Sequence, residues 1–109
     1  MKNRSNQRLE SITTGTLIVG VDIAKHVHWA RFVDCRGMEI GKAVSFPNDR
    51  QGFEKIVARI EEICKRNRKE SVLIGLEPTG HYWKTLANYL AERGHRVVGV
   101  NPYDGHVEK

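Results

Sequence analysis

The sequence predicts an α/β fold in which helices pack on a mixed five-stranded sheet, and three observations support this prediction. Residues 17–21 and 72–76 are two unbroken apolar runs, a pattern typical of strands buried on both faces, as parallel strands are. Residues 48–68 and 79–93 carry apolar side chains at helical spacing. Short turns join the first predicted strands, whereas helices join the later ones. The expected order is therefore three strands, helix, strand, helix, strand.

The composition indicates which class of protein this is and which kind of partner it binds. The 109 residues suffice for one domain, and 39% hydrophobic with 28% charged residues is typical of a soluble globular protein. No apolar run approaches the roughly 20 residues that span a bilayer. The polar start lacks the apolar core of a secretion signal, and the isolated Cys35 and Cys64 favour reduced thiols, so we expect a cytoplasmic protein. The net charge of +5 favours nucleic acid as a partner.

The N-terminal part is predicted to hold an arm and three strands. Residues 1–15 show no periodicity and are expected to form a flexible arm. Strands are predicted at residues 16–22, 26–35 and 38–46, with Gly37 in the turn between the last two, so an antiparallel meander is expected. In the third strand, the apolar residues of one parity are Met38, Ile40, Val44 and Phe46.

The segment after Pro47 has the features of a helix that starts at Asn48 and runs to about residue 68. The Asn48 side chain can accept a hydrogen bond from the free amides of the first turn, and Gln51 stands where the partner of a capping box belongs. The basic residues at the end of the helix suit its dipole, an explanation that we favour over phosphate contact. One apolar stripe for packing on the sheet contains Phe53, Ile56, Val57, Ile60, Ile63 and Cys64.

The C-terminal part should complete the sheet. A buried strand at residues 71–77 precedes a helix over residues 79–93, which Gly94 ends, and a last strand at residues 95–100. A strand, helix, strand unit closes right-handed and pairs its strands as near neighbours. Because the meander occupies one side of the first strand, the fourth strand takes the other side. The predicted order is 3-2-1-4-5 with strand 2 antiparallel, which is the plan of the ribonuclease-H-like fold.

Each of the two buried strands ends in an acid, Asp22 or Glu77. If these strands are parallel neighbours about 4.8 Å apart, the acids converge at the carboxyl edge, where α/β sheets bind ligands. Close carboxylates repel one another unless a cation neutralises them, and oxygen ligands select Mg²⁺ or Mn²⁺. A pair of such ions about 4 Å apart stabilises the attacking and leaving oxygens of a displaced phosphodiester. We therefore predict that Asp22 and Glu77 are catalytic and bind metal.

Further polar and aromatic residues near the acids are candidates for nucleic-acid contact, and these are Lys25, His28, Thr79, His81 and Tyr82. Turn and strand-surface roles explain Lys25 and His28 equally well. His26 and His28 share one strand face, but no third metal ligand is evident, so a solvated face is favoured. A role as the cap of the second helix is enough to explain Thr79, and packing in the core is the first explanation for Trp83. For His81 and Tyr82, base stacking stays open.

Three segments carry a family resemblance, namely residues 19–25 together with His28, residues 75–83 and residues 98–103. They resemble the N-terminal part of the DEDD transposases of insertion sequence 110 type. The similarity covers about residues 17–104, nearly the whole predicted domain. The Glu-Pro-Thr-Gly block that starts at Glu77 is fairly specific to this family.

The resemblance implies a fold and a ligand set. Residues 16–109 would form part of a RuvC-like, ribonuclease-H-like catalytic domain, and four acids would bind metal, normally two ions. Asp22 matches the first acid and Glu77 the second. The other two belong to a later Asp-x-x-Asp segment, and Asp104 with Glu108 does not have that spacing. A chain with half of the ligands is expected to bind metal weakly and to cleave poorly.

The resemblance also implies an activity and partners. It predicts the N-terminal part of a transposase that catalyses metal-dependent DNA cleavage and strand transfer, with DNA as substrate. A C-terminal domain with a nucleophilic Ser, an RNA guide and a homo-oligomeric state are implied for the full-length protein alone. The present chain is expected to be inactive by itself.

Two functions of other classes are also compatible with the residues. Sugar and acetate kinases of the actin-like fold begin with a Gly-x-Asp hairpin that binds ATP phosphate, and Gly20 and Asp22 have this spacing. Those hairpins usually follow the Asp with Gly and with Ser or Thr, which the Ile-Ala-Lys sequence here lacks. A non-catalytic nucleic-acid-binding or assembly module is the third candidate.

Overall fold

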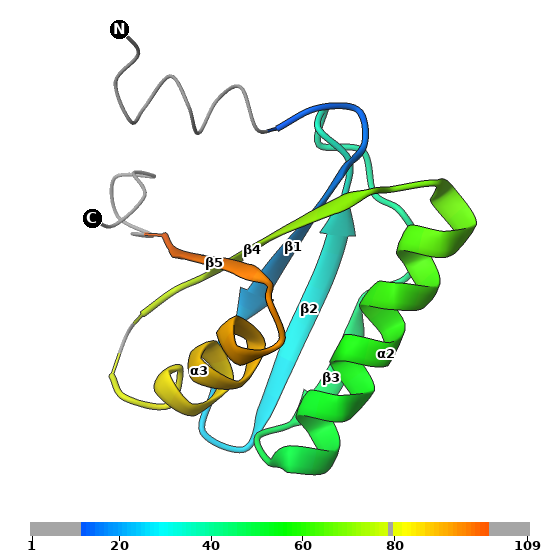
Figure 1. The fold of residues 1–109 in the computed structure, drawn as a ribbon. Coiled ribbons are helices and arrows are strands. Elements are labelled where there is room, and N and C mark those ends of the chain that lie inside the picture. Colours follow the sequence, from blue (N-terminus) through cyan, green and yellow to red (C-terminus); the bar gives the residue numbers. More distant parts are fainter. Residues whose placement is uncertain (1–11, 79, 101–109) are drawn as a thin grey trace, which may run out of the picture.

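The structure, a computed structural model, describes residues 12–78 and 80–100 and confirms the predicted sheet (Figure 1). The elements in chain order are β1 (Thr16–Asp22), β2 (Val27–Val33), β3 (Val44–Pro47), α2 (Arg50–Asn67), β4 (Ser71–Leu76), α3 (Lys84–Glu92) and β5 (Arg96–Gly99). The strand order is β3-β2-β1-β4-β5. β1 is parallel to β4 and β4 is parallel to β5, whereas β2 is antiparallel to both of its neighbours.

The helices α2 and α3 lie on the same face of the sheet (Figure 1). Along β1, Leu17, Val19 and Val21 are buried, whereas Gly20 and Asp22 on the other face are exposed. The prediction that β1 and β4 are buried on both faces is therefore wrong for the described residues. The reason is handedness, because two right-handed crossovers that advance in the same direction across a sheet place their helices on one side. We call the uncovered side the open face.

The start of α2 differs from the prediction by one residue. Asp49, not Asn48, is the N-cap, and its carboxylate accepts a hydrogen bond from the amide of Gly52 at 2.8 Å. No capping box forms with Gln51, because the third helical position is taken by Gly52, which has no side chain. The Asn48 side chain is used elsewhere, in the loop contacts described below. The helix ends with Arg68 in the left-handed conformation, at φ 55°.

The third strand is shorter than predicted, because β3 comprises four residues rather than residues 38–46. Gly41 takes a φ of 75°, which breaks the ladder, and only an isolated bridge between Val33 and Glu39 precedes it. Met38, which was expected on the apolar side with Phe46, is 65% exposed. Phe46 itself is buried in the core, as its position in the pattern predicts.

The second helix is also shorter, because α3 begins at Lys84 rather than at residue 79. A turn precedes it in which Gly80 has a φ of 66° and the Trp83 indole N–H donates to the Gly80 carbonyl at 3.1 Å. Trp83 packs against the core, which confirms its predicted role. At the other end Gly94 has a φ of 86°, so it ends the helix as predicted.

The residues just before β1 are hydrogen-bonded to the segment between α2 and β4. The Gly15 carbonyl accepts a hydrogen bond from the amide of Glu70, and the Lys69 ammonium donates to the carbonyl of Thr14 at 2.7 Å. The rest of the predicted arm, residues 1–11, lies outside the described residues. Neither described helix has the length and apolar character that a membrane crossing demands.

The turn after β2 depends on a carboxylate and yields a testable pH dependence. Asp34 accepts hydrogen bonds from the amides of Met38 and Arg36, each at 2.9 Å, and the Met38 bond is the main cause that lowers the pKa of Asp34 below its ordinary 3.8. A lowered folded-state pKa contributes stability above the ordinary value, and this contribution is lost as pH falls through the folded pKa. Wild type is thus expected to unfold at a higher temperature than Asp34→Ala at pH 7, with the difference shrinking below pH about 4. A constant difference down to pH 2 would contradict this role.

Candidate functional site

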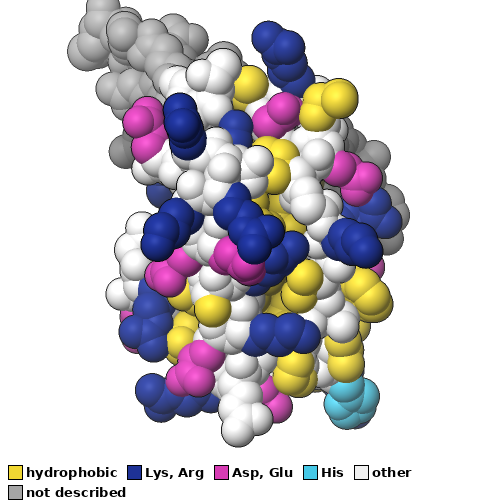
Figure 2. Space-filling model, turned by 90° about the vertical axis from the view of Figure 1, so that its right-hand side faces the viewer, with side chains coloured by type: hydrophobic (Ala, Val, Ile, Leu, Met, Phe, Trp, Pro, Cys, Tyr) yellow, Lys and Arg dark blue, Asp and Glu magenta, His cyan; other side chains and the backbone are white. Residues whose placement is uncertain are grey.

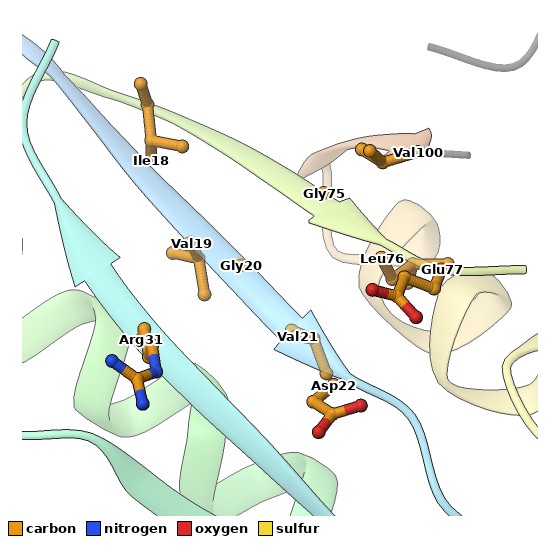
Figure 3. A pocket seen from close by; sticks show the side chains of 10 residues that line it. All are labelled: Ile18, Val19, Gly20, Val21, Asp22, Arg31, Gly75, Leu76, Glu77 and Val100. Carbon is orange, nitrogen blue, oxygen red and sulfur yellow. The ribbon is translucent and has the colours of Figure 1, made fainter. Parts of the chain in front are cut away.

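The two predicted acids, Asp22 and Glu77, line one pocket on the open face (Figure 3). In the parallel β1–β4 register Val21 is opposite Leu76, so the acids follow as the next residues of adjacent strands. Asp22 is exposed and Glu77 is half-buried. The pocket has a volume of about 360 Å³ and opens broadly to solvent. The pairing of the parallel strands β1 and β4 thus brings both carboxylates to the edge of the sheet that the sequence predicts.

Glycines form the floor of this pocket. Gly20 of β1 lies opposite Gly75 of β4, and both line the pocket beside the acids. A Cβ atom built at Gly20 would have no heavy atom within 4 Å, whereas one at Gly75 would lie 3.3 Å from a methyl group of Val100. The missing side chains leave bare backbone across β1 and β4, two residues before Asp22 and Glu77.

The donor set of the pocket suits a hard divalent ion. Two carboxylates offer oxygen ligands alone, and Mg²⁺ is commonly held by one or two carboxylates together with water and substrate phosphate. Within residues 12–78 and 80–100, no group of three or more His, Cys, Asp or Glu side chains is placed to hold a metal ion. Asp22 and Glu77, which line one pocket, offer two carboxylates of the kind that such an ion takes as ligands.

His28 is fully buried, so its predicted place on a solvated strand face with His26 is wrong. Its ring packs against Phe46, with centroids 5.3 Å apart. Its Nδ1 atom accepts from the amide of Ala24 at 3.1 Å, so the proton lies on Nε2, which donates to Asn48 at 3.0 Å. A side chain so enclosed cannot reach nucleic acid, and we withdraw it as a contact residue. Its parity with the core residue Phe32 was the sequence signal for this burial.

The contacts of Asn48 and His28 hold the loop that follows Asp22. The Asn48 side-chain amide donates to the carbonyl of Lys25 at 3.1 Å, and the Asn48 backbone amide donates to the carbonyl of His26 at 2.8 Å. Three segments are thereby joined, namely the β1–β2 loop, β2 and the turn between β3 and α2. The Lys25 side chain is exposed on this fixed loop, three residues after Asp22.

The remaining candidates lie between Glu77 and α3. The rings of His81 and Tyr82 are 4.6 Å apart, with His81 exposed and Tyr82 half-buried. Both are accessible, so their proposed contact with nucleic acid stays a prediction. Thr79 lies outside the described residues.

Sequence reasoning missed two residues on the open face, Trp29 and Arg31. Trp29 is opposite Asp22 in the β1–β2 register and is 51% exposed. Arg31 is opposite Gly20 and lines the same pocket as the two acids. The sequence showed these residues only as part of a strand, because their nearness to the acids depends on the register between strands.

Charged side chains on α2 do not form a continuous basic surface. Figure 2 shows Lys and Arg interspersed with Asp and Glu on the side of the molecule where this helix lies. Ion pairs within the helix contribute to this pattern and join Arg50 to Glu54, Arg59 to Glu62 and Arg66 to Glu62. Lys65 and Arg66 occupy the last turn, where they suit the helix dipole.

Comparisons with known proteins bear on the family and on the fold of this chain. A sequence model of a transposase family, the DEDD type of insertion sequence 110, matches residues 19–107. The pilin gene-inverting proteins of Moraxella bovis and Moraxella lacunata are each 30% identical over 84 residues, which are 77% of this chain and 24% of theirs. The chain thus spans about a quarter of the length of these curated relatives.

A solved structure shares the fold. It is a protein of Bacteroides thetaiotaomicron with an actin-like ATPase fold, and it superposes with a TM-score of 0.55 over 90% of this chain and 37% of its own. The two sequences are 18% identical, so this likeness concerns the fold alone. The five-stranded mixed sheet is common to ribonuclease-H-like and actin-like proteins.

Proposed function

Because the chain belongs to the insertion sequence 110 family of DEDD transposases, we propose that it supplies the first two metal-binding acids of a DNA-cleaving and DNA-joining site. One observation carries the proposal, namely that Asp22 and Glu77 line the same pocket at the carboxyl ends of adjacent parallel strands. The substrate that we propose for the full-length protein is DNA. An RNA guide and a homo-oligomeric state rest on the family resemblance alone.

The residues of the pocket have distinct roles in this proposal. Asp22 and Glu77 would hold Mg²⁺ or Mn²⁺ with one carboxylate from each strand. The bound ion supplies charge stabilisation for the attacking and leaving oxygens of the phosphodiester. Lys25 is exposed on the loop fixed by Asn48, where its ammonium group would pair with a backbone phosphate of the DNA.

We propose that this chain has little cleavage activity by itself. Two carboxylates leave most positions around an ion to water, so the ion is held weakly and its place relative to the phosphate is not fixed. Two ions would need more ligands than Asp22 and Glu77 provide. A nuclease assay with supercoiled DNA and Mg²⁺ tests this point, since robust cleavage that Asp22→Asn abolishes would contradict the proposed inactivity.

Titration with Mn²⁺, followed by electron paramagnetic resonance, tests the metal site. We expect Asp22→Asn and Glu77→Gln each to weaken binding about tenfold or more, since loss of even an outer partner of a metal ligand costs that much. The double variant should lose the site. Glu61→Gln is the matched control, because it removes an exposed carboxylate of α2 that does not line the pocket. Equal Mn²⁺ affinity in the double variant and in wild type would exclude this function.

The same titration separates the alternatives raised by the sequence. A kinase segment of the actin-like fold should bind Mg²⁺ only together with ATP, so a thermal shift that needs ATP would favour it. A non-catalytic nucleic-acid-binding module should bind DNA equally well with and without the two acids. The transposase proposal requires metal binding that depends on Asp22 and Glu77 and not on nucleotide.

A further inference from the structure

We propose that Trp29 and Arg31 form a binding site on the open face for a single strand of nucleic acid, with a base stacked on the indole and a phosphate paired with the guanidinium. This inference deepens the proposed function, on which it rests for the direction of the strand toward the acids. It names a substrate-binding surface that lies beside the metal pocket. The supporting observations are exposure, strand register and the shape of the groove.

Trp29 is placed as a stacking platform. Its side chain is 51% exposed, and no hydrogen bond to it is found within residues 12–78 and 80–100. The other tryptophan, Trp83, packs against the core and donates its indole N–H to the Gly80 carbonyl. A half-exposed tryptophan on a sheet face offers a large apolar ring to the flat face of a base, and such stacking tolerates any base.

The register places this platform next to the metal pocket. Trp29 and Asp22 are directly opposite one another on antiparallel strands, so their Cβ atoms are about 5 Å apart. Asp22 ends the neighbouring strand β1, and Glu77 directly follows β4, the next strand across the sheet. A strand with one phosphate at the acids would therefore bring a neighbouring base over the indole.

Arg31 provides the cation for the backbone of the strand. It lines the pocket and is opposite Gly20, which in turn is opposite Gly75, so no side chain of β1 or β4 stands in the same row as Arg31. Figure 3 shows Arg31 on the strand next to these glycines. Its ion pair with Glu39 is 4.0 Å long and exposed on both sides. Exposed ion pairs of this kind contribute little to the free energy of folding, so a phosphate can replace Glu39 as the partner of Arg31 at small cost. An aromatic platform and a cation beside an open groove are the elements of single-strand recognition.

Charge favours a nucleic-acid strand over a protein segment on this face. Ile18 and Val100 give the groove an apolar part, which a second copy of the chain could also cover. Such a cover would remove the exposed Arg31 and Asp22 from water, and burial of charges is costly unless each is paired. A strand of nucleic acid instead brings phosphates to Arg31 and lets Asp22 keep its water or a metal ion. The net charge of +5 acts in the same direction.

Fluorescence of Trp29 tests the inference. In a Trp83→Phe background Trp29 is the one remaining tryptophan of the two in the sequence. Titration with oligo(dT) in EDTA should quench the Trp29 emission saturably. Trp29→Ala should bind the oligonucleotide about tenfold more weakly, as measured by the fluorescence anisotropy of a labelled oligonucleotide. Trp29→Phe should keep most of the affinity. Met38→Ala, which removes another exposed apolar side chain away from the pocket, should bind like the background protein.

Salt dependence tests the role of Arg31. Arg31→Gln should lower the slope of log affinity against log salt by about 0.7, the value for one phosphate contact on a single strand. Arg50→Gln is the matched control, because this exposed arginine lies on α2 and outside the pocket. A parallel titration with oligo(rU) establishes whether the strand is DNA or RNA. The nucleic acid that binds more tightly is the one that the site takes.

Three results would overturn the inference. They are an unquenched Trp29, equal affinity of Trp29→Ala and its background, and concentration-dependent burial of Trp29 without oligonucleotide, which would assign the face to a second copy. Because these titrations contain EDTA, they do not depend on the metal site. If the two acids do not bind Mn²⁺ but Trp29 is still quenched, strand binding stands without the metal site. If Mn²⁺ binds but Trp29 is not quenched, the metal site stands without strand binding.

Discussion

Replacement of Gly52 by alanine is expected to destabilise the protein by about 3 kcal/mol, the upper part of the range for overpacking a tight site. Gly52 lies in the first turn of α2, where its amide donates to Asp49. A Cβ atom at this position would lie 1.9 Å from the carbonyl oxygen of Pro47 and 2.8 Å from its carbonyl carbon. Both contacts are with backbone, so the start of the helix must move away from the end of β3. The higher helix propensity of alanine, about 1 kcal/mol, offsets only part of this cost.

Urea unfolding followed by circular dichroism measures the effect. Gly20→Ala is the matched control, since its Cβ atom would meet no heavy atom within 4 Å and should leave the midpoint nearly unchanged. Similar midpoints for Gly52→Ala and Gly20→Ala would show that the β3–α2 turn relaxes without cost. That outcome would contradict the close packing of α2 on Pro47.

Replacement of Asn48 by alanine is expected to cost about 2 kcal/mol, within the range for a buried hydrogen-bonding group left without a partner. The variant removes the acceptor of the His28 Nε2–H and the donor to the Lys25 carbonyl. His28 is fully buried whereas Asn48 is half-exposed, so water that enters the space left by the amide replaces only part of the lost acceptor. The loop after Asp22 should also lose its anchor, with shifted amide resonances for Ala24 and Lys25.

Urea unfolding and ¹⁵N–¹H spectra test both parts of this prediction. Asn48→Asp keeps the acceptor for His28 but loses the donor to Lys25, so it should retain more stability than Asn48→Ala while the loop resonances still move. A third variant, Asn88→Ala, removes an exposed amide from α3 and serves as the control. Unchanged stability of Asn48→Ala would mean that the His28 contact contributes nothing to the fold.

Local patterns in the sequence were sufficient to predict the strand order of the sheet and the edge at which the two acids lie. Unbroken apolar runs marked β1 and β4, and the acid after each run marked the carboxyl edge of the sheet. One error, at the start of α2, arose because neighbouring residues compete for one role. Asn48 and Asp49 both suit a helix cap, and only the demand of buried His28 for an acceptor decides between them.

By itself, the sequence determined the number and order of the strands and the edge at which Asp22 and Glu77 emerge, because these features depend on periodicity and on the handedness of short connections. The tertiary structure alone decided which face of each strand is covered. Both crossover helices fall on one side of the sheet, so His28 is buried while Trp29, the next residue in β2, is exposed beside Asp22. Side chains alternate between the two faces of a strand, and only the placement of the helices determines which set meets solvent.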